Sequence, residues 1–192
     1  MKKNLIYFII FGVVVILVIG GVFTVKIVTR KQFIDYITPI ANDILTNYNI
    51  QPNISIAQAS FESNFGQSNL AKTGNNLFGI QATSDWIAAG KPVYTTQKTK
   101  NSTSGGFLGL FTKTTTTKIS VGFKKYNSWA ESFTDWAELI ANSGRYEDAY
   151  FSAQQGDLQS YAQQVKAAGY DTTDINYASD LVSVDKTIKL IG

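Results

Sequence analysis

The chain combines one long apolar segment with a longer part in which apolar and polar residues alternate at helical spacing. Residues 5–25 carry no charged side chain, whereas residues 32–192 hold several stretches with apolar residues three or four positions apart. The first pattern is typical of a membrane span, and the second of amphipathic helices packed around a core. We therefore predict an N-terminal segment at 1–31 and one compact domain at 32–192.

The N-terminal segment has the length of a membrane-spanning helix. As a helix, its 21 uncharged residues would extend about 31 Å, which matches a hydrocarbon core of roughly 30 Å. The following stretch, Thr24–Arg30, is a poor cleavage site for a signal peptidase, so an uncleaved single-pass signal anchor is expected. Glycines at 12, 20 and 21 would allow this helix to pack against another membrane protein.

Helical periodicity predicts the first two helices of the domain. Residues 32–49 place an apolar stripe on one face, and Pro39 would kink this helix or divide it into two. A short helix is expected between Pro52 and Gly66, with Gly66 ending it. A brief helical turn at 68–72 and a compact turn at 75–80 follow.

The C-terminal third of the chain is also predicted to be helical. Ser128 has Glu131 three residues later, which is the spacing of a capping box. Trp129, Phe133 and Trp136 then share one face, and we assign them to the core. Three further helical segments are expected at 146–153, 157–168 and 177–190.

Between these helical parts, apolar residues recur at every second position instead of every third or fourth. Residues 93–99 and 118–126 alternate as β-strands do, which predicts a small β-lobe at about 91–126. The Ser-, Gly- and Thr-rich stretch at 101–117 is expected to be a mobile, exposed loop. The fold class is therefore mainly α (α+β), with one small β-hairpin inserted among helices.

The composition restricts the chemistry available to this chain. It has no cysteine and no histidine, which excludes Ser-His-Asp and Cys-His catalysis and thiolate metal sites. We expect no metal and no cofactor. Five of the 17 basic residues and none of the 14 acidic ones lie in the first 31 positions, so the remainder carries a net charge of −2. That balance does not favour binding to nucleic acid.

Glu62 is the one of the four glutamates with the most apolar neighbours. It follows Phe61 at the end of a short predicted helix whose apolar face includes Ile54 and Ala57. A carboxyl group beside apolar surface and near the negative end of a helix dipole should have a raised pKa, as a general acid at neutral pH requires. The alternative is an ordinary surface glutamate on an amphipathic helix.

Four stretches in the same order resemble the glucosaminidase domain of bacterial peptidoglycan hydrolases, glycoside hydrolase family 73 (mannosyl-glycoprotein endo-beta-N-acetylglucosaminidase-like). Residues 54–66, ISIAQASFESNFG, are similar to the catalytic helix of the family. Residues 68–80, with NNLFGI at 75–80, resemble the segment after it. The stretches at 93–97 and 123–129 are similar to the hairpin and its exit. GYDTTDINYA at 169–178 resembles the closing signature, with Ile175 at a usual proline position.

This resemblance implies a lysozyme-like helical fold and hydrolysis of the β-1,4 bond after N-acetylglucosamine in peptidoglycan. It makes Glu62 the general acid that protonates the glycosidic oxygen. Tyr177 corresponds to a functional tyrosine that orients water or steadies developing positive charge. For the saccharide cleft, which combines amide and aromatic side chains, the candidates are Asn76, Phe78, Tyr94 and Tyr126.

The second catalytic group is less well defined than the acid. The family often has a glutamate in the hairpin at the position that Lys98 occupies here. Asp85, next to Trp86, is the best remaining acid between the catalytic helix and the hairpin. The alternative is that the substrate's own acetamido group assists the reaction, so that no protein nucleophile is needed.

The predicted substrate also orients the anchor. Peptidoglycan lies outside the cell membrane, so residues 32–192 should be extracytoplasmic and held at the membrane by the N-terminal helix. A lytic transglycosylase is an alternative, because it shares the lysozyme-like fold and a lone catalytic glutamate. A catalytically weak peptidoglycan-binding or scaffold module is another, and Lys98 in the hairpin favours it.

Overall fold

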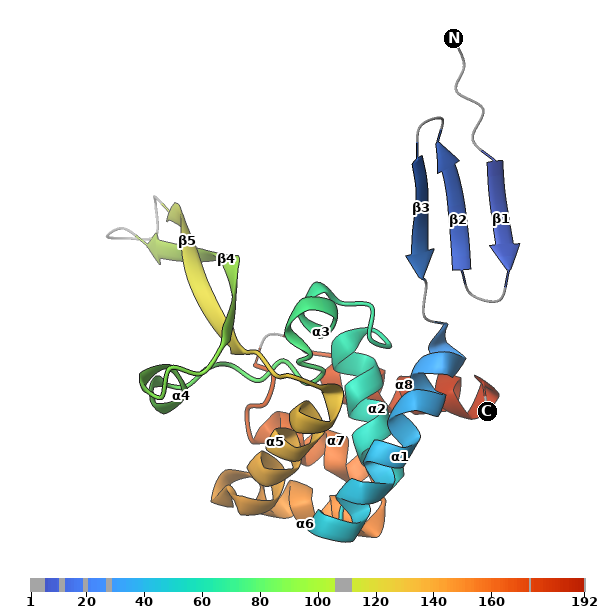
Figure 1. Ribbon diagram of the computed structural model, residues 1–192. Coiled ribbons are helices and arrows are strands. Elements are labelled where there is room, and N and C mark those ends of the chain that lie inside the picture. Colours follow the sequence, from blue (N-terminus) through green and yellow to red (C-terminus); the bar gives the residue numbers. More distant parts are fainter. Residues whose placement is uncertain are drawn as a thin grey trace.

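A computed structural model describes most of the chain. The described residues are 6–10, 13–18, 21–26, 29–105, 112–172 and 174–191, with side chains described at 29–97, 119–172 and 174–191. From Thr29 onward the chain forms a helical body. One long β-hairpin, at residues 93–124, is inserted between the helices that precede it and those that follow it in the sequence (Figure 1). The fold is therefore mainly α with a small antiparallel sheet, as the apolar periodicity predicts.

The N-terminal segment differs from the single helix that we expected. It contains three strands, β1 (Ile6–Ile10), β2 (Val13–Val18) and β3 (Gly21–Lys26), which pair in antiparallel order β1-β2-β3. The segment is rich in β-branched valine and isoleucine, which favour strands, and glycines interrupt it in the sequence. Apolar length alone therefore did not predict its secondary structure.

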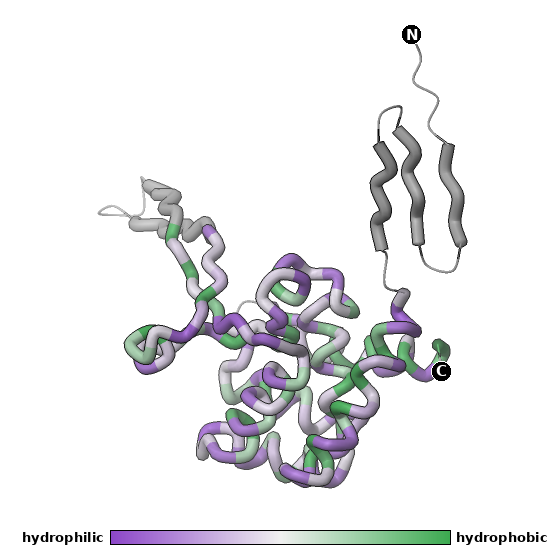
Figure 2. The backbone as a smooth tube through the Cα atoms, in the orientation of Figure 1, coloured by the Kyte–Doolittle hydropathy of each residue, from purple (hydrophilic) through white to green (hydrophobic). Residues whose placement is uncertain are grey.

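In the part of the chain that the structure describes, six helices of two turns or more make up the helical body. Their bounds are α1 (Arg30–Tyr48), α2 (Pro52–Ser63), α5 (Trp129–Asn142), α6 (Glu147–Gln155), α7 (Leu158–Ala167) and α8 (Tyr177–Ile191). Three shorter elements connect them, namely α3 (Asn69–Gly74), α4 (Ser84–Ala88) and the 3₁₀ helix η2 (Gly144–Tyr146). Among the described residues, no helix combines the length and apolar character needed to cross a membrane. Figure 2 shows the reason, since apolar and polar residues are interleaved along these helices.

Helix α1 runs without a break through Pro39. Its predicted stripe is confirmed, because Phe33, Ile37 and Ile44 are all buried in the core. Pro39 lies on the exposed side of the helix, where the backbone bond that proline removes can be replaced by water. The N-terminus begins with a capping box in which Thr29 and Gln32 bond each other's backbone N–H groups.

Helix α2 is the central helix of the body. Seven of its twelve residues are buried, and it packs against α1, α7 and α8 (Figure 1). Most of the buried positions are alanine or serine, whose small side chains let the neighbouring helices approach closely. Burial on several sides makes α2 a rigid support for any side chain at its C-terminal end.

The end of α2 is built by left-handed backbone rather than by Gly66 alone. Asn64, Phe65 and Gly66 have φ angles of 49°, 53° and 74°, so the helix stops at Ser63, earlier than we expected. The Ser63 hydroxyl accepts a hydrogen bond from the Gly66 N–H at 2.7 Å and holds this turn closed. A Cβ atom at Gly66 would lie 2.8 Å from the Phe33 ring, so a glycine is needed where the chain crosses α1.

The hairpin is longer than the alternation of apolar residues indicates. Strands β4 (Val93–Gly105) and β5 (Thr112–Lys124) pair throughout, from Val93 opposite Lys124 to Gly105 opposite Thr112. The expected loop at 101–117 is thus largely strand, and only residues 106–111 at its tip lie outside the described residues. Threonine is β-branched and favours strands, so the threonine run extends the sheet although it lacks apolar alternation.

The root of the hairpin is fixed to the helical body by Asn76. Its amide nitrogen donates to the backbone oxygens of Ile80 and Lys124 at 2.9 and 2.8 Å, and its amide oxygen accepts from the Ile80 N–H. The side chain is almost fully buried and satisfies three backbone groups. Figure 1 shows the two strands extending from this root away from the helices.

Candidate active site

Glu62 lies at the C-terminal end of α2, where the N-terminus of α8 meets it. The hydroxyl of Tyr177, the first residue of α8, donates a hydrogen bond to Glu62 Oε1 at 2.9 Å. The Glu62 side chain is partly exposed, whereas Tyr177 is fully buried. The structure thus brings together the two residues that the resemblance assigns to catalysis, although 115 positions separate them.

The surroundings of Glu62 favour its neutral form. The pKa of this carboxyl is raised from its ordinary value of 4.5 to about 7, because burial and the charges of Asp171 and Asp174 raise it more than the Tyr177 hydrogen bond lowers it. Burial is the largest of these causes. The direction agrees with the prediction made from the apolar neighbours of Glu62. A carboxyl with this pKa is partly protonated at neutral pH and can donate a proton.

A buried polar network supports the contact between Glu62 and Tyr177. Gln58 lies one helical turn before Glu62 on α2, and its Nε2 donates to the Tyr177 hydroxyl oxygen at 3.0 Å. Its Oε1 accepts from the indole Nε1 of Trp136 at 3.2 Å and from the hydroxyl of Tyr161. All three partners of Gln58 are completely buried. The periodicity assigned Trp136 to the core, and its ring nitrogen connects the core to the site.

Aromatic rings surround this network. The Phe61 ring meets the Tyr177 ring edge to face at 5.3 Å, and the Tyr170 ring lies 6.3 Å from it. Burial and the charge of Glu62 raise the pKa of Tyr170 and of Tyr177. Both hydroxyls therefore remain protonated at neutral pH and act as hydrogen-bond donors. Tyr170 uses its hydrogen for the backbone oxygen of Phe78, and Tyr177 uses its hydrogen for Glu62.

The acids whose charges act on Glu62 are in the loop between α7 and α8. Asp171 Oδ1 accepts from the N–H of Asp174 at 3.1 Å, and Asp174 Oδ1 accepts from the N–H of Asn176 at 2.8 Å. Sequence reasoning did not single out these two residues. They lie within the closing signature at 169–178, which we used only to select Tyr177. That family signature could have pointed to both aspartates as well.

Asp85, the predicted second carboxylate, lies in a different element from these acids. It is exposed in the first turn of the short helix α4, which Thr83 caps by accepting from the N–H of Trp86. An acidic residue there is favourable for the helix itself, because the N-terminus carries partial positive charge. This arrangement accounts for Asp85 without catalysis.

Three of the four predicted cleft residues are buried. Phe78 is 1% exposed and stacks on Trp136 with ring centroids 4.7 Å apart, so it belongs to the core and offers no face to a sugar. The Asn76 side-chain amide is hydrogen-bonded to the backbone at the hairpin root. Tyr126 is 4% exposed and donates to Asp135 at 2.7 Å. Tyr94 on β4 is half-buried and keeps part of its ring accessible.

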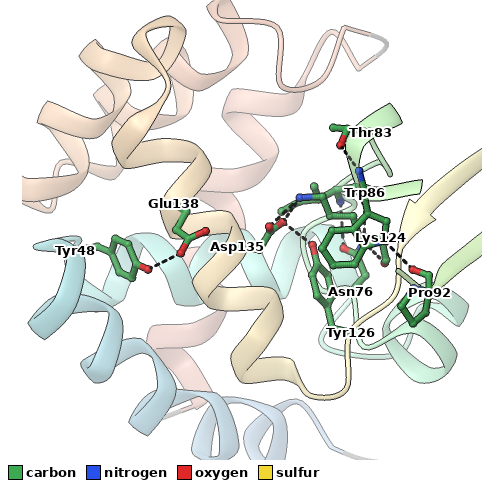
Figure 3. Close-up of polar contacts among 10 residues, drawn as sticks. Tyr48, Asn76, Thr83, Trp86, Pro92, Lys124, Tyr126, Asp135 and Glu138 are labelled. Carbon is green, nitrogen blue, oxygen red and sulfur yellow. Dashed lines mark hydrogen bonds and ion pairs between the residues drawn. The ribbon is translucent and has the colours of Figure 1, made fainter. Parts of the chain in front are cut away.

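An open groove lies beside the hairpin root and does not contain Glu62. Figure 3 shows its polar side, where Lys124 and Tyr126 both bond Asp135, and the indole nitrogen of Trp86 donates to the Pro92 oxygen. Its volume is about 350 Å³, and its lining residues are Trp86, Tyr126, Ala130, Glu131, Thr134, Asp135 and Glu138. The ammonium groups of Lys91 and Lys124 lie 4.5 and 4.9 Å from the Trp86 ring centre. The hydrogen bonding and the raised pKa of Glu62, rather than this groove, therefore identify the candidate site.

The family of the chain follows from a comparison with known proteins. A family model described as Glucosaminidase, mannosyl-glycoprotein endo-beta-N-acetylglucosaminidase, matches residues 38–190. The chain belongs to this glucosaminidase family. The resemblance read from the four stretches is thus confirmed, and the domain is a glycoside hydrolase domain.

The chain is also similar to individual peptidoglycan hydrolases. It is 29% identical to peptidoglycan hydrolase FlgJ of Vibrio parahaemolyticus and 29% identical to exo-glucosaminidase LytG of Bacillus subtilis, over 85% and 84% of its own length. It spans only about half of each relative, 49% and 52%. Among solved structures, the catalytic domain of the autolysin Auto from Listeria monocytogenes is similar, with a TM-score of 0.64, 29% identity and coverage of 85% of this chain and 86% of that one.

Proposed function

We propose that residues 32–192 hydrolyse the β-1,4 bond after N-acetylglucosamine in peptidoglycan, with Glu62 as the general acid. The observation that carries this proposal is the hydrogen bond between Glu62 and Tyr177, which holds a carboxyl of raised pKa at a partly exposed position. Membership of the glucosaminidase family supports the reaction class. The names of its relatives support peptidoglycan as the substrate.

In the proposed reaction the Glu62 carboxyl protonates the glycosidic oxygen as the bond breaks. Proton loss leaves a carboxylate, and the Tyr177 hydroxyl already donates to one of its oxygens, so the charge forms where a hydrogen bond is in place. The sugar develops oxocarbenium character, which nearby negative charge stabilises. Asp171 and Asp174 supply negative charge in the loop that leads into Tyr177.

The pKa of Glu62 sets the expected pH dependence. The acid must be protonated, so kcat/KM should fall as pH rises through about 7, the raised pKa of Glu62. A surface glutamate of ordinary pKa would place that fall between pH 4 and 5. A pH profile of hydrolysis of purified peptidoglycan measures the difference directly.

The second catalytic group is proposed to be either the substrate's acetamido group or Asp85. Lys98 stands where the family often has a hairpin glutamate, which leaves the substrate group as the simpler choice. The exposed position of Asp85 in α4 also favours assistance by the substrate. Near-parent turnover of Asp85→Asn would exclude Asp85 as the base, whereas a loss of about 100-fold or more would support it.

The bond specificity is open to two alternatives that the products distinguish. A hydrolase leaves reducing N-acetylglucosamine ends, whereas a lytic transglycosylase leaves anhydromuramic ends.

The LytG relative is named an exo-glucosaminidase. An exo-acting enzyme releases small fragments first, whereas an endo-acting enzyme shortens strands internally. Chromatography of glycan strands after brief digestion separates these modes, and we expect internal cleavage.

The catalytic domain is proposed to act outside the cell membrane, where peptidoglycan lies. The uncharged stretch at 5–25 is the feature that supports membrane attachment. Fractionation of cells that express the full chain tests this placement against a variant lacking residues 1–28. Recovery of both proteins in the same soluble fraction would argue against attachment.

A catalytically weak binding module is the remaining alternative. Zymography on gels that contain peptidoglycan tests it with the parent protein and Glu62→Gln. Clearing by the parent and none by Glu62→Gln supports hydrolysis. Binding to peptidoglycan without clearing by the parent would favour a binding module.

A further inference from the structure

Gln58 is a buried amide one turn before Glu62, and its orientation can be deduced from its partners. An indole N–H can only donate, so the Gln58 atom that faces Trp136 at 3.2 Å must be the amide oxygen. The Tyr161 hydroxyl contacts the same oxygen. Two donors therefore fix the amide oxygen toward the core and turn its nitrogen toward Tyr177.

This orientation determines where the Tyr177 hydrogen goes. The Gln58 amide donates to the Tyr177 oxygen at 3.0 Å, so the hydrogen of that hydroxyl is free only for Glu62 Oε1 at 2.9 Å. A donor on Oε1 leaves Oε2 as the atom that carries the acidic proton. Oε2 lies on the side of Gly79, because a Cβ atom added at Gly79 would be 3.9 Å from Oε2.

We propose that Gln58 is a positioning residue that acts on Glu62 through Tyr177. It directs the Tyr177 hydrogen to Oε1 and so reserves Oε2 for the proton that is delivered to the glycosidic oxygen. Donation by Gln58 also polarises the Tyr177 hydroxyl, which makes it a stronger donor to the Glu62 carboxylate. This inference rests on the proposed role of Glu62 as the acid.

Other groups around Glu62 must be considered in any titration. Tyr161 of α7 is buried and Tyr170 is half-buried, and both stay protonated at neutral pH, since burial raises the pKa of both. The charges of Asp171 and Asp174, in the loop before α8, raise the pKa of Glu62. None of these groups occupies the Tyr177 oxygen, which only Gln58 contacts as a donor among the hydrogen bonds of the described residues.

The most direct test uses the unaltered full chain. Nuclear magnetic resonance can follow the side-chain amide nitrogen of Gln58 and the carboxyl carbon of Glu62 across pH. The chain has four glutamates, so carbon labelling gives four signals and Glu62→Gln assigns the one of interest. We expect the Gln58 amide and the Glu62 carboxyl to titrate with the same midpoint. A Gln58 signal that does not change through the Glu62 titration would overturn the proposal.

Two variants then separate positioning from packing. Gln58→Met keeps the length of the side chain but cannot donate, and we expect the Glu62 ionisation constant to decrease about threefold to tenfold and kcat to fall about tenfold. Tyr161→Phe is the matched control, because it removes another buried hydrogen-bonding group from the network but leaves the bond from Gln58 to Tyr177. Its effect on the Glu62 titration should be less than half as large.

An unchanged Glu62 titration in folded Gln58→Met would contradict positioning and support a packing role. If Gln58→Met does not fold, the titration of the unaltered chain still decides. These titrations need no substrate, so they remain interpretable if peptidoglycan hydrolysis is not observed. Conversely, hydrolysis with independent titrations of Gln58 and Glu62 would refute only the positioning role.

Discussion

The helical body and the hairpin of this protein are specified by different physical means. Around Glu62, buried side chains from α2, α5, α7 and α8 satisfy one another through long-range hydrogen bonds. In the hairpin, backbone pairing over 13 residues on each strand provides the structure. Burial raises the pKa of Glu62 because packed side chains of the body enclose much of its carboxyl group.

The two regions also differ in charge. Residues 86–130, which comprise the hairpin and its flanking segments, contain seven lysines and no acidic residue, whereas the rest of 32–192 has five basic residues against 14 acidic ones. The near-neutral total of the domain therefore hides a basic hairpin on an acidic body. Because peptidoglycan, the proposed substrate, carries peptide carboxylates, the hairpin should attract it and the body should weakly repel it.

The largest expected effect is on the stability of the body. Phe33 is fully buried against Phe65, Gly66 and Trp129, so Phe33→Ala should lower the free energy of unfolding by about 3 to 5 kcal/mol. Tyr36→Ala is the matched control on the same helix, because Tyr36 also contacts Trp129 but is 62% exposed. Urea denaturation should show a loss below about 1 kcal/mol for it.

A hairpin variant, measured by the same urea denaturation, provides the comparison with Phe33→Ala. Thr114→Ala changes one residue of a paired strand, opposite Thr103, and should cost at most about 1 kcal/mol. Equal losses for Phe33→Ala and Thr114→Ala would refute the distinction between a packed body and a backbone-paired hairpin.

The second expected effect is on catalysis at the body. Tyr177→Phe removes the donor to Glu62 Oε1, so kcat/KM should fall about 100-fold. Because the Tyr177 hydrogen bond lowers the pKa of Glu62, its loss should move the alkaline limb of the pH profile to higher pH. Tyr94→Phe, a half-buried tyrosine on β4, is the control. A fall in activity with an unmoved limb would count against the assigned role of the bond.

The third effect is a dependence of stability on pH. Glu62 has a pKa of about 7 in the folded chain against 4.5 for an ordinary glutamate, so folding becomes less favourable as pH rises between these values. Glu62→Gln avoids this cost and should gain about 2 to 3 kcal/mol over the parent on going from pH 4 to pH 8. Thermal melts at both pH values, with exposed Glu138→Gln as control, measure it. A constant difference across pH would show that Glu62 is not held neutral.

The smallest effect is on binding through the hairpin. In a Glu62→Gln background, changing Lys98, Lys100, Lys113 and Lys118 to glutamine should weaken binding to purified peptidoglycan about tenfold at low salt, with convergence at high salt. The matched control changes four lysines outside the hairpin, Lys31, Lys72, Lys186 and Lys189. Cosedimentation measures both. Equal weakening by the two sets would show that only net charge matters.

The sequence predicted the elements that depend on local pattern. The stripe of α1, the cap of α5 at Ser128 and the core position of Trp136 follow from apolar spacing and capping residues, and the structure has them. The end of α2 was misplaced because Asn64 and Phe65 adopt left-handed backbone, which is uncommon for residues other than glycine. The extent of β5 was missed because threonines pair without apolar alternation.

The site was predictable only in part. Glu62 and Tyr177 were singled out as candidates, because one has apolar neighbours and both lie in family stretches, and the structure joins them by a hydrogen bond. The bonds from Gln58 to Tyr177 and Trp136 join residues 119 and 78 positions apart, and no local pattern reports such contacts. Phe78 was wrongly placed at the cleft, since an aromatic residue in a polar turn does not reveal that its ring stacks on Trp136.

The central claim is that Glu62 donates the proton that breaks the bond after N-acetylglucosamine. Mass spectrometry of muropeptides after digestion of purified peptidoglycan, by the parent and by Glu62→Gln, tests it most directly. We expect reducing N-acetylglucosamine ends from the parent and a loss of about 1,000-fold in Glu62→Gln. Anhydromuramic ends from the parent, or the same products at a similar rate from Glu62→Gln, would contradict it.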